Sequence, residues 1–181
     1  PAHAQRHVPT LLKELDGTDF SLAANAVSRC RAQGRDIVGY VMLLLSKDRR
    51  TVLQLATNDT GAKLTRRCLV SMGQNGKLLV TSDRVGDRDL FSDELYVPVR
   101  CRPSDSLDTM LQCHHKMRGN LGELVPMGED LILEMRRIND NWIDRMLASG
   151  QLALAGNGTE VRLTPRAVVR SSQRVLKSLF S

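Results

Sequence analysis

The chain has 181 residues, which suits one ordinary domain or two small domains packed together. Its residues are 41% hydrophobic and 25% charged, which excludes a largely disordered protein, and the aromatic share of 3% means that a core must be built from aliphatic side chains. The formal net charge of +6 favours polyanionic partners.

The apolar runs and the cysteines indicate in which compartment the protein is expected. The longest apolar run, residues 38–45, is far shorter than the roughly 20 residues that cross a bilayer, so no membrane partner is expected. The four cysteines have no CxxC spacing, and a chain of this length has core enough without disulfides. We therefore expect reduced thiols and an intracellular protein, cytoplasmic or nuclear.

Three helices are predicted in the N-terminal half, and two of them flank an apolar run. Asp19 is a suitable N-cap for a helix over residues 20–33, which Gly34 would end. Thr60 or Asp59 is a suitable cap for a helix over residues 61–72.

The apolar run between these helices has two interpretations. Residues 37–46 are predicted as a helix, and the alternative is a buried strand that turns at residues 47–50 into a second strand over residues 51–56. Periodicity cannot separate a helix from a buried strand in so short a run. The turn in the alternative is the charged sequence Lys-Asp-Arg-Arg.

Strands and turns are predicted with clearer signals further along. Residues 73–76, Gly-Gln-Asn-Gly, form a turn before a strand over residues 77–81. A polar loop over residues 82–92 leads to a second strand, residues 95–99, which Pro98 restricts to the edge of a sheet.

The second half is predicted to be mainly helical. Pro103 and the following Ser-Asp-Ser mark the best domain boundary, dividing the chain into residues 1–102 and 103–181. Helices are predicted over residues 107–118, 129–138 and 141–149.

The end of the chain has a recognisable order of elements. The helix over residues 141–149 ends at Gly150, and an apolar strand over residues 151–155 follows it. A Gly-Asn-Gly turn leads to an alternating strand over residues 160–164, after which Pro165 opens a final helix.

This order resembles winged helix-turn-helix domains. In that family the third helix often enters a major groove and the hairpin lies against the DNA backbone. Residues 61–99 match more loosely, and a faint repeat relates residues 67–80 to residues 145–155. The resemblance implies an α+β, mostly helical fold that is winged-helix-like, with two tandem winged-helix domains as its fullest form.

Basic residues supply the candidate binding sites. On the final helix, Arg166, Arg170, Arg174 and Lys177 recur at spacings of four, four and three, so they form one stripe that would neutralise phosphates. The alternative is a solvated face of a surface helix. The remaining candidates lie on or beside the predicted recognition helix, on the hairpin and on the helix of the first half: Arg136, Arg137, Asn141, Arg145, Arg162, Lys63, Arg66 and Arg67.

Signals for a metal or for catalysis are weak. Cys113, His114 and His115 are consecutive, and on a helix three successive side chains point about 100° apart, so no metal site is predicted. An acidic loop, residues 83–94, follows a calcium-loop pattern only in part. The chain contains none of the common catalytic or cofactor-binding motifs, so we expect a non-catalytic protein without a cofactor.

These observations together predict a nucleic-acid-binding protein. Duplex DNA is favoured over RNA because exposed aromatic side chains are expected to be few. One alternative is a protein–protein adaptor or assembly subunit that uses the winged-helix surfaces, either with a protein partner or as a homodimer. RNA binding is the second alternative.

Overall fold

The computed structural model describes residues 15–32, 35–58, 66–83, 94–156 and 161–169. The chain divides into two compact units. The first comprises Pro1–Arg84 and Leu95–Ile132, and the second comprises Val85–Glu94 and Leu133–Ser181. Pro103, where the sequence suggested a domain boundary, lies inside the first unit.

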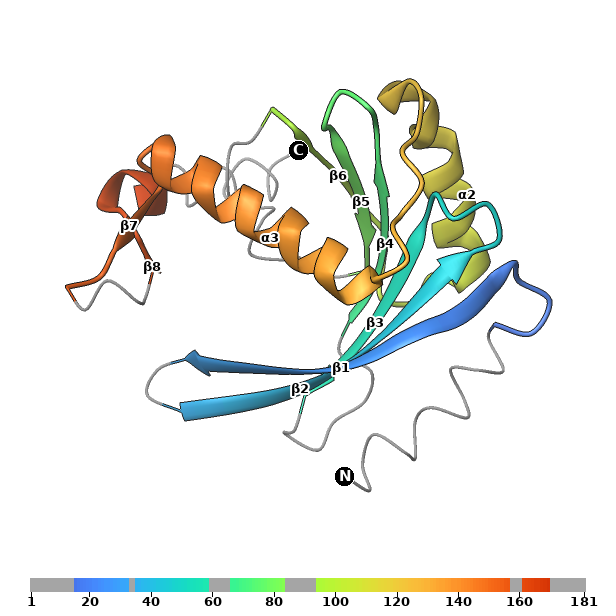
Figure 1. The fold of residues 1–181 in the computed structure, drawn as a ribbon, viewed down its shortest axis with the longest axis horizontal. Helices are drawn as coiled ribbons and strands as arrows, with labels where there is room; N and C mark the ends of the chain where they lie inside the picture. Colours follow the sequence, from blue (N-terminus) through green and yellow to red (C-terminus); the bar gives the residue numbers. More distant parts are fainter. Residues whose placement is uncertain (1–14, 33–34, 59–65, 84–93, 157–160, 170–181) are drawn as a thin grey trace. The chain divides into compact units, whose positions relative to one another are not determined.

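A six-stranded sheet dominates the first unit (Figure 1). The strands stand side by side in chain order, and neighbours from β1 to β5 are antiparallel, whereas β6 runs parallel to β5. The strands are β1 (Phe20–Ala32), β2 (Arg35–Ser46), β3 (Val52–Asn58), β4 (Arg66–Met72), β5 (Leu78–Ser82) and β6 (Tyr96–Arg100).

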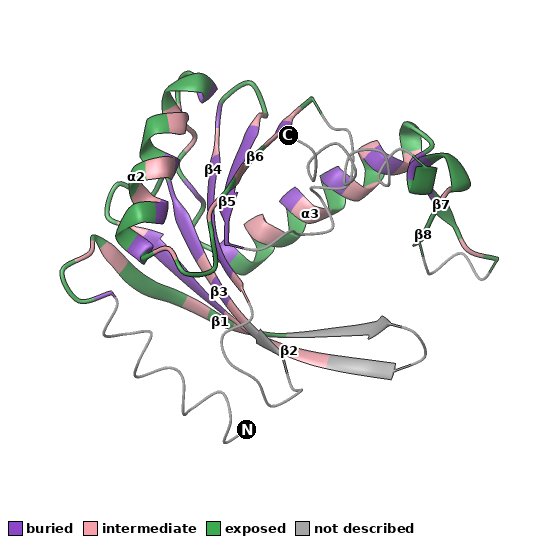
Figure 2. Cartoon of the chain, turned by 180° about the vertical axis from the view of Figure 1, so that it is seen from behind, coloured by how far each residue is buried: buried purple, intermediate pink, exposed green. Residues whose placement is uncertain are grey.

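Strands β4 and β5 of this sheet are buried on both faces (Figure 2). Every residue of β5 is buried, and so is the interior of β4 from Arg67 to Ser71. Strands covered on both sides become continuous apolar runs without the alternation that marks a half-buried strand. The sheet is therefore hard to see in the sequence.

Helix α2 (Leu107–Arg118) packs on one face of the sheet. Ser106 caps it by accepting a hydrogen bond from the Thr109 N–H at 3.2 Å. Leu107 and Met110 are buried one helical turn apart and join the aliphatic core around Leu53 and Leu69. A short 3₁₀ turn, η2 (Gly119–Leu121), follows the helix.

The second unit has a small core of its own. Helix α3 (Leu131–Ala148) begins in the first unit and contributes its residues from Leu133 onward to the second. A hairpin of β7 (Leu152–Leu154) and β8 (Val161–Leu163) follows it. Leu152 packs against Trp142 and Met146. Residues 165–169 are helical.

The predicted fold class is wrong. Strands hold well over a third of the described residues, against about 20–25% in an average globular protein, so the fold is an α+β fold built on a mixed sheet and not a mostly helical, winged-helix protein. The helix predicted for residues 20–33 is strand β1, and that for residues 61–72 is strand β4 over its described part. For residues 37–46 the strand alternative is confirmed by β2.

The faint internal repeat also fails. Residues 67–72 form a strand, whereas residues 145–148, their proposed counterparts, lie in helix α3. The separate helices predicted at residues 129–138 and 141–149 are one continuous helix. The two segments therefore differ in structure despite a similar order of residue types. Residues 67–72 are a strand because they pair with β3 and β5, whereas residues 145–148 are helical.

Several local predictions are confirmed. They include the turn at residues 73–76, the strands that became β5 and β6, helix α2 with its bounds, and both strands of the C-terminal hairpin. Pro98 lies on β6, the last strand of the sheet, as its missing N–H requires. No helix within the described residues is long and apolar enough to span a membrane.

Candidate functional site

The turn between β2 and β3 is held in shape by one carboxylate. Asp48 Oδ1 accepts hydrogen bonds from Ser46 Oγ at 2.6 Å and from the Arg50 N–H at 3.0 Å. Partial burial raises the pKa of Asp48, but these hydrogen bonds and the Arg118 guanidinium outweigh it and lower the pKa to about 2. Asp48 is therefore charged at neutral pH, and Lys47 beside it is exposed.

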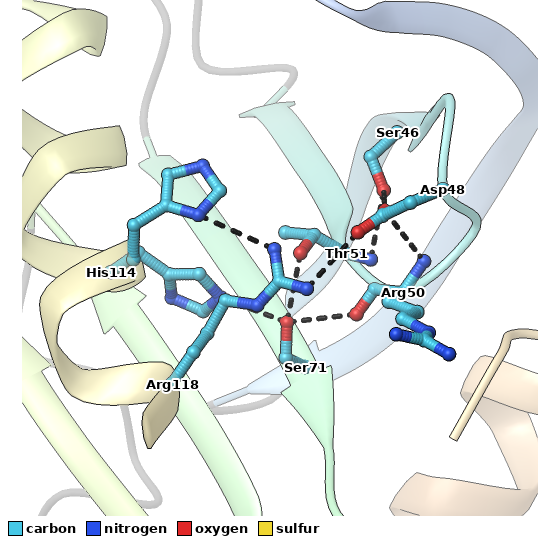
Figure 3. Close-up of polar contacts among 8 residues, drawn as sticks. Ser46, Asp48, Arg50, Thr51, Ser71, His114 and Arg118 are labelled. Atoms are coloured by element: carbon cyan, nitrogen blue, oxygen red, sulfur yellow. Dashed lines mark hydrogen bonds and ion pairs between the residues drawn. The ribbon is translucent and has the colours of Figure 1, made fainter. Parts of the chain in front are cut away.

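The same carboxylate joins this turn to the end of helix α2 (Figure 3). Arg118 Nη2 lies 3.1 Å from Asp48 Oδ2, and Arg118 Nη1 lies 3.3 Å from His115 Nδ1. The last turn of α2 carries three basic side chains, His115, Lys116 and Arg118. The ion pair thus joins the β2–β3 turn to the last turn of α2, two basic segments that are about 70 residues apart in sequence.

We call the resulting surface the basic end of the first unit. Its members are Lys47, Arg49, Arg50, His115, Lys116 and Arg118. All of them are exposed except Arg118, which is half-buried. Three of them, Lys47, His115 and Arg118, line a surface pocket of about 320 Å³, and its other walls are Asp19, Phe20, Ser46, Asp48 and Thr51. Asp48 and Asp19 are the carboxylates that line it, beside the basic side chains of Lys47, His115 and Arg118.

A buried polar network lies beneath the basic end. His114 is fully buried on α2, with its Nε2 atom 3.0 Å from Ser71 Oγ and its Nδ1 atom 2.9 Å from Thr81 Oγ1. Ser71 Oγ also donates to the Arg50 carbonyl oxygen at 2.8 Å and lies 2.9 Å from Thr51 Oγ1.

The Arg50 carbonyl fixes the direction of the hydrogen bond between Ser71 and His114, and the neutral state of the ring fixes the bond to Thr81. A carbonyl oxygen can only accept, so it takes the single hydroxyl hydrogen of Ser71. Ser71 must then accept from His114 Nε2–H, and the free Nδ1 atom of His114 accepts from the Thr81 hydroxyl. The ring is the neutral Nε2–H tautomer.

The charge state of His114 agrees with this tautomer. Burial above all, and then the positive charges of Arg118 and His115, lower the pKa of His114 to about 3. A nucleophilic serine needs a histidine that accepts its proton, whereas here the histidine donates to Ser71. The pair therefore positions α2 on the sheet and does not activate a nucleophile.

A second buried cluster secures the other end of α2. Arg67 Nε lies 2.8 Å from Asp83 Oδ2, and both side chains are 8% exposed. Arg67 Nη2 also donates to the carbonyl oxygens of Pro103 and Asp105, at 3.2 and 2.7 Å. These carbonyls belong to the loop just before α2, so the ion pair fixes where the helix begins.

The residues predicted to bind nucleic acid on the first-half helix lie elsewhere than expected. Arg66 and Arg67 are on strand β4, and Lys63 lies outside the described residues. Arg66 is half-buried with its Nε atom 3.2 Å from Ser82 Oγ. Because the Arg67 guanidinium is buried against Asp83, we leave Arg67 out of any binding surface.

The predicted residues of the second unit are mostly at its surface. On α3, Arg136, Arg137 and Asn141 are exposed, and Arg137 lies 3.6 Å from Glu134. Asp140 and Asp144 are exposed on the same helix. Arg145 is half-buried, whereas Arg162 and Arg166 are exposed; Arg170, Arg174 and Lys177 lie outside the described residues.

The basic end itself was missed in the sequence. The run Lys-Asp-Arg-Arg at residues 47–50 was visible, but only the strand interpretation of residues 37–46 makes it a turn. Helix α2 was predicted correctly, yet nothing local shows that its last turn meets Asp48. Within the described residues, no group of three or more His, Cys, Asp or Glu side chains is arranged to hold a metal ion.

Comparison with known proteins gives no relative with which this site can be compared. No family model, no curated protein and no solved structure matches the chain.

Proposed function

We propose that the protein is a non-catalytic nucleic-acid-binding protein that contacts the phosphate backbone through its basic end. The observation that carries the proposal is the ion pair between Arg118 and Asp48, which gathers the basic β2–β3 turn and the basic last turn of α2 on one surface. Closely spaced cations displace the counterions condensed on a nucleic acid, and this release drives binding.

Asp48 has a positioning role in this proposal. Its carboxylate neutralises part of the charge of Arg118, but it also holds the backbone of the turn in place. Arg49 is held as well, because its guanidinium donates to the Met127 carbonyl oxygen at 3.3 Å. Lys47, Arg50 and Lys116 are also exposed, and none of the contacts described above uses their side chains, so these three cations are the ones proposed to meet phosphates.

The aromatic side chains favour a duplex over a single strand. Single-strand binders stack bases on exposed rings. Of the aromatic residues whose burial is described, Tyr96 and Trp142 are buried, and Phe20 and Tyr40 are half-buried. Because none of these four described rings is fully exposed, contact through the phosphates of a duplex is the mode that fits this surface. The basic stripe from Arg166 to Lys177 stays a prediction for a second contact.

Charge reversal at the basic end tests the proposal. In the Arg50→Glu/Lys116→Glu variant we expect duplex DNA affinity to fall at least tenfold at low salt, with a shallower dependence of log Kd on log salt concentration. Fluorescence anisotropy with a short labelled duplex, a single strand and an RNA hairpin measures both quantities and ranks the targets.

A matched control separates the effect of the position of the substitutions from the effect of the change in net charge. The Arg100→Glu/Arg102→Glu variant changes the net charge equally, but its exposed side chains precede α2, at the opposite end from Arg118. We expect the control to lose much less affinity. Equal losses in both variants would mean that only overall charge matters, and unchanged affinity in Arg50→Glu/Lys116→Glu would remove the basic end from the binding surface.

A further inference from the structure

Two cysteines of the first unit lie on neighbouring segments, one just before helix α2 and one within it. Cys101 directly follows strand β6, and Cys113 lies on α2. Both are free thiols, and both are half-buried, so each is partly accessible to small molecules in solution.

Contacts with strand β5 hold the two cysteines close together. The Cys101 N–H donates to the Ser82 carbonyl oxygen at 3.0 Å, so Cys101 prolongs the pairing of β6 with β5. Thr81, the residue before Ser82, has its Oγ1 atom 2.9 Å from Nδ1 of His114, the residue after Cys113. Each cysteine therefore lies within one residue of a contact with the same end of β5.

The side chains of the two cysteines also meet. Cys101 packs against the core cluster that contains Leu107 and Met110 of α2, so its side chain lies on the face of the sheet that α2 covers. Cys113 is one helical turn after Met110 and lies on the same side of α2. The Cys113 side chain is a hydrogen-bond partner of the Cys101 thiol, so the two sulfur atoms are within reach of each other.

We propose that Cys101 and Cys113 form a reversible redox pair, which a small disulfide such as oxidised glutathione converts into a disulfide bridge within the chain. A bridge needs two sulfur atoms that can approach to bonding distance without movement of the backbone. Two thiols that already contact each other meet this need. The bridge would join the segment after β6 covalently to α2, and it does not depend on nucleic-acid binding.

The proposed exchange has two balanced steps. The Cys113 sulfur attacks one sulfur of oxidised glutathione and forms a mixed disulfide, and one reduced glutathione leaves with a thiol proton. The Cys101 sulfur then attacks the Cys113 sulfur, forms the bridge and releases the second reduced glutathione with the other proton. The two cysteines lose two electrons in total, and the oxidised glutathione gains them.

The surroundings of Cys101 assign the first attack to Cys113. Burial above all, and then the neighbouring Cys113 thiol, raise the pKa of Cys101 to about 11. Because the thiolate is the nucleophile, Cys101 attacks a disulfide in solution slowly at neutral pH. It acts instead on the mixed disulfide at Cys113, whose sulfur is already held beside it.

Treatment of the folded, full-length chain with oxidised glutathione tests this inference. We expect proteolysis without reduction to give a peptide that links Cys101 to Cys113, and dithiothreitol to reverse the link. The Cys101→Ser variant should stop at the mixed disulfide on Cys113. The Cys113→Ser variant should acquire glutathione at Cys101 at least tenfold more slowly than Cys113 reacts in the wild type.

The matched control is Cys30→Ser, which changes a cysteine on strand β1 and should leave the bridge unaffected. Glutathione carried separately on Cys101 and Cys113 of the wild type, or no reaction at either, would overturn the inference. So would a bridge that forms only in urea, because folding would then keep the sulfur atoms apart. A link found only between two chains, seen as a dimer on a non-reducing gel, would overturn it as well.

Discussion

At the scale of single residues, one hydroxyl hydrogen decides the chemistry beneath the basic end. Because Ser71 gives its hydrogen to the Arg50 carbonyl, His114 must donate toward Ser71, and burial lowers the pKa of His114 so that the ring is neutral. Each polar atom of the buried ring then has a partner, which is the condition for burying such a group without a large loss of stability.

The lowered pKa of His114 predicts an acid-sensitive fold. The unfolded chain binds a proton at His114 below an ordinary pKa of about 6.5, whereas the folded protein resists it down to about 3. Stability from this residue is therefore fully present above pH 6.5 and falls as the pH decreases toward 3. Between about pH 6 and pH 5, the slope should approach about 1.4 kcal/mol per pH unit.

The neighbouring residues His114 and His115 provide a test variant and a matched control for this pH dependence. Urea unfolding at several pH values should show that His114→Gln is less stable at neutral pH but loses much of the slope between about pH 6.5 and 5. His115→Gln, which changes an exposed ring, should keep the slope of the wild type. A wild-type slope in His114→Gln would show that another group causes the pH dependence.

At the scale of elements, the loop after α2 packs closely on the turn between β4 and β5. A Cβ atom built on Gly73 would lie 2.6 Å from the Leu121 carbonyl oxygen and 2.8 Å from Asn75 Oδ1. The Val125 N–H donates to the Met72 carbonyl at 2.8 Å, so the backbone of this loop is fixed against the sheet.

We expect Gly73→Ala to reduce the free energy of unfolding by about 1–3 kcal/mol, because backbone must move to admit the methyl group. Gly119→Ala is the matched control: that position is αR with φ −55°, and no atom lies within 4 Å of the added Cβ. Its stability should be unchanged or raised by up to about 1 kcal/mol. Thermal or urea unfolding measures both, and equal effects would contradict the close packing at Gly73.

Local elements were predictable from the sequence, and long-range ones were not. Helix α2 has a cap at Ser106 and an apolar face of its own, and the C-terminal hairpin has a turn signal between short apolar strands. By contrast, β1 and β4 are strands because of their neighbours in the sheet. Pairing across many residues outweighs the caps and glycines that suggested helices there.

At the scale of the whole molecule, the candidate site could be predicted only in its parts. The basic run at residues 47–50 and the basic end of α2 are both visible in the sequence. Their meeting depends on β2 and β3 forming a hairpin and on α2 lying along the sheet with its last turn at Asp48. The predicted recognition helix instead proved to be part of α3, whose exposed residues include Asp140 and Asp144.

The basic end belongs wholly to the first unit and is held by the contacts of α2 with the sheet.

Hydrogen–deuterium exchange with and without a short DNA duplex tests the central claim most directly, because it locates the contact. The account predicts slower exchange, on binding, in peptides that cover residues 46–51 and 113–119, and little change in peptides from strands far from that surface. Protection confined to residues 131–169, with the basic end unchanged, would contradict it and would place nucleic-acid binding on the second unit.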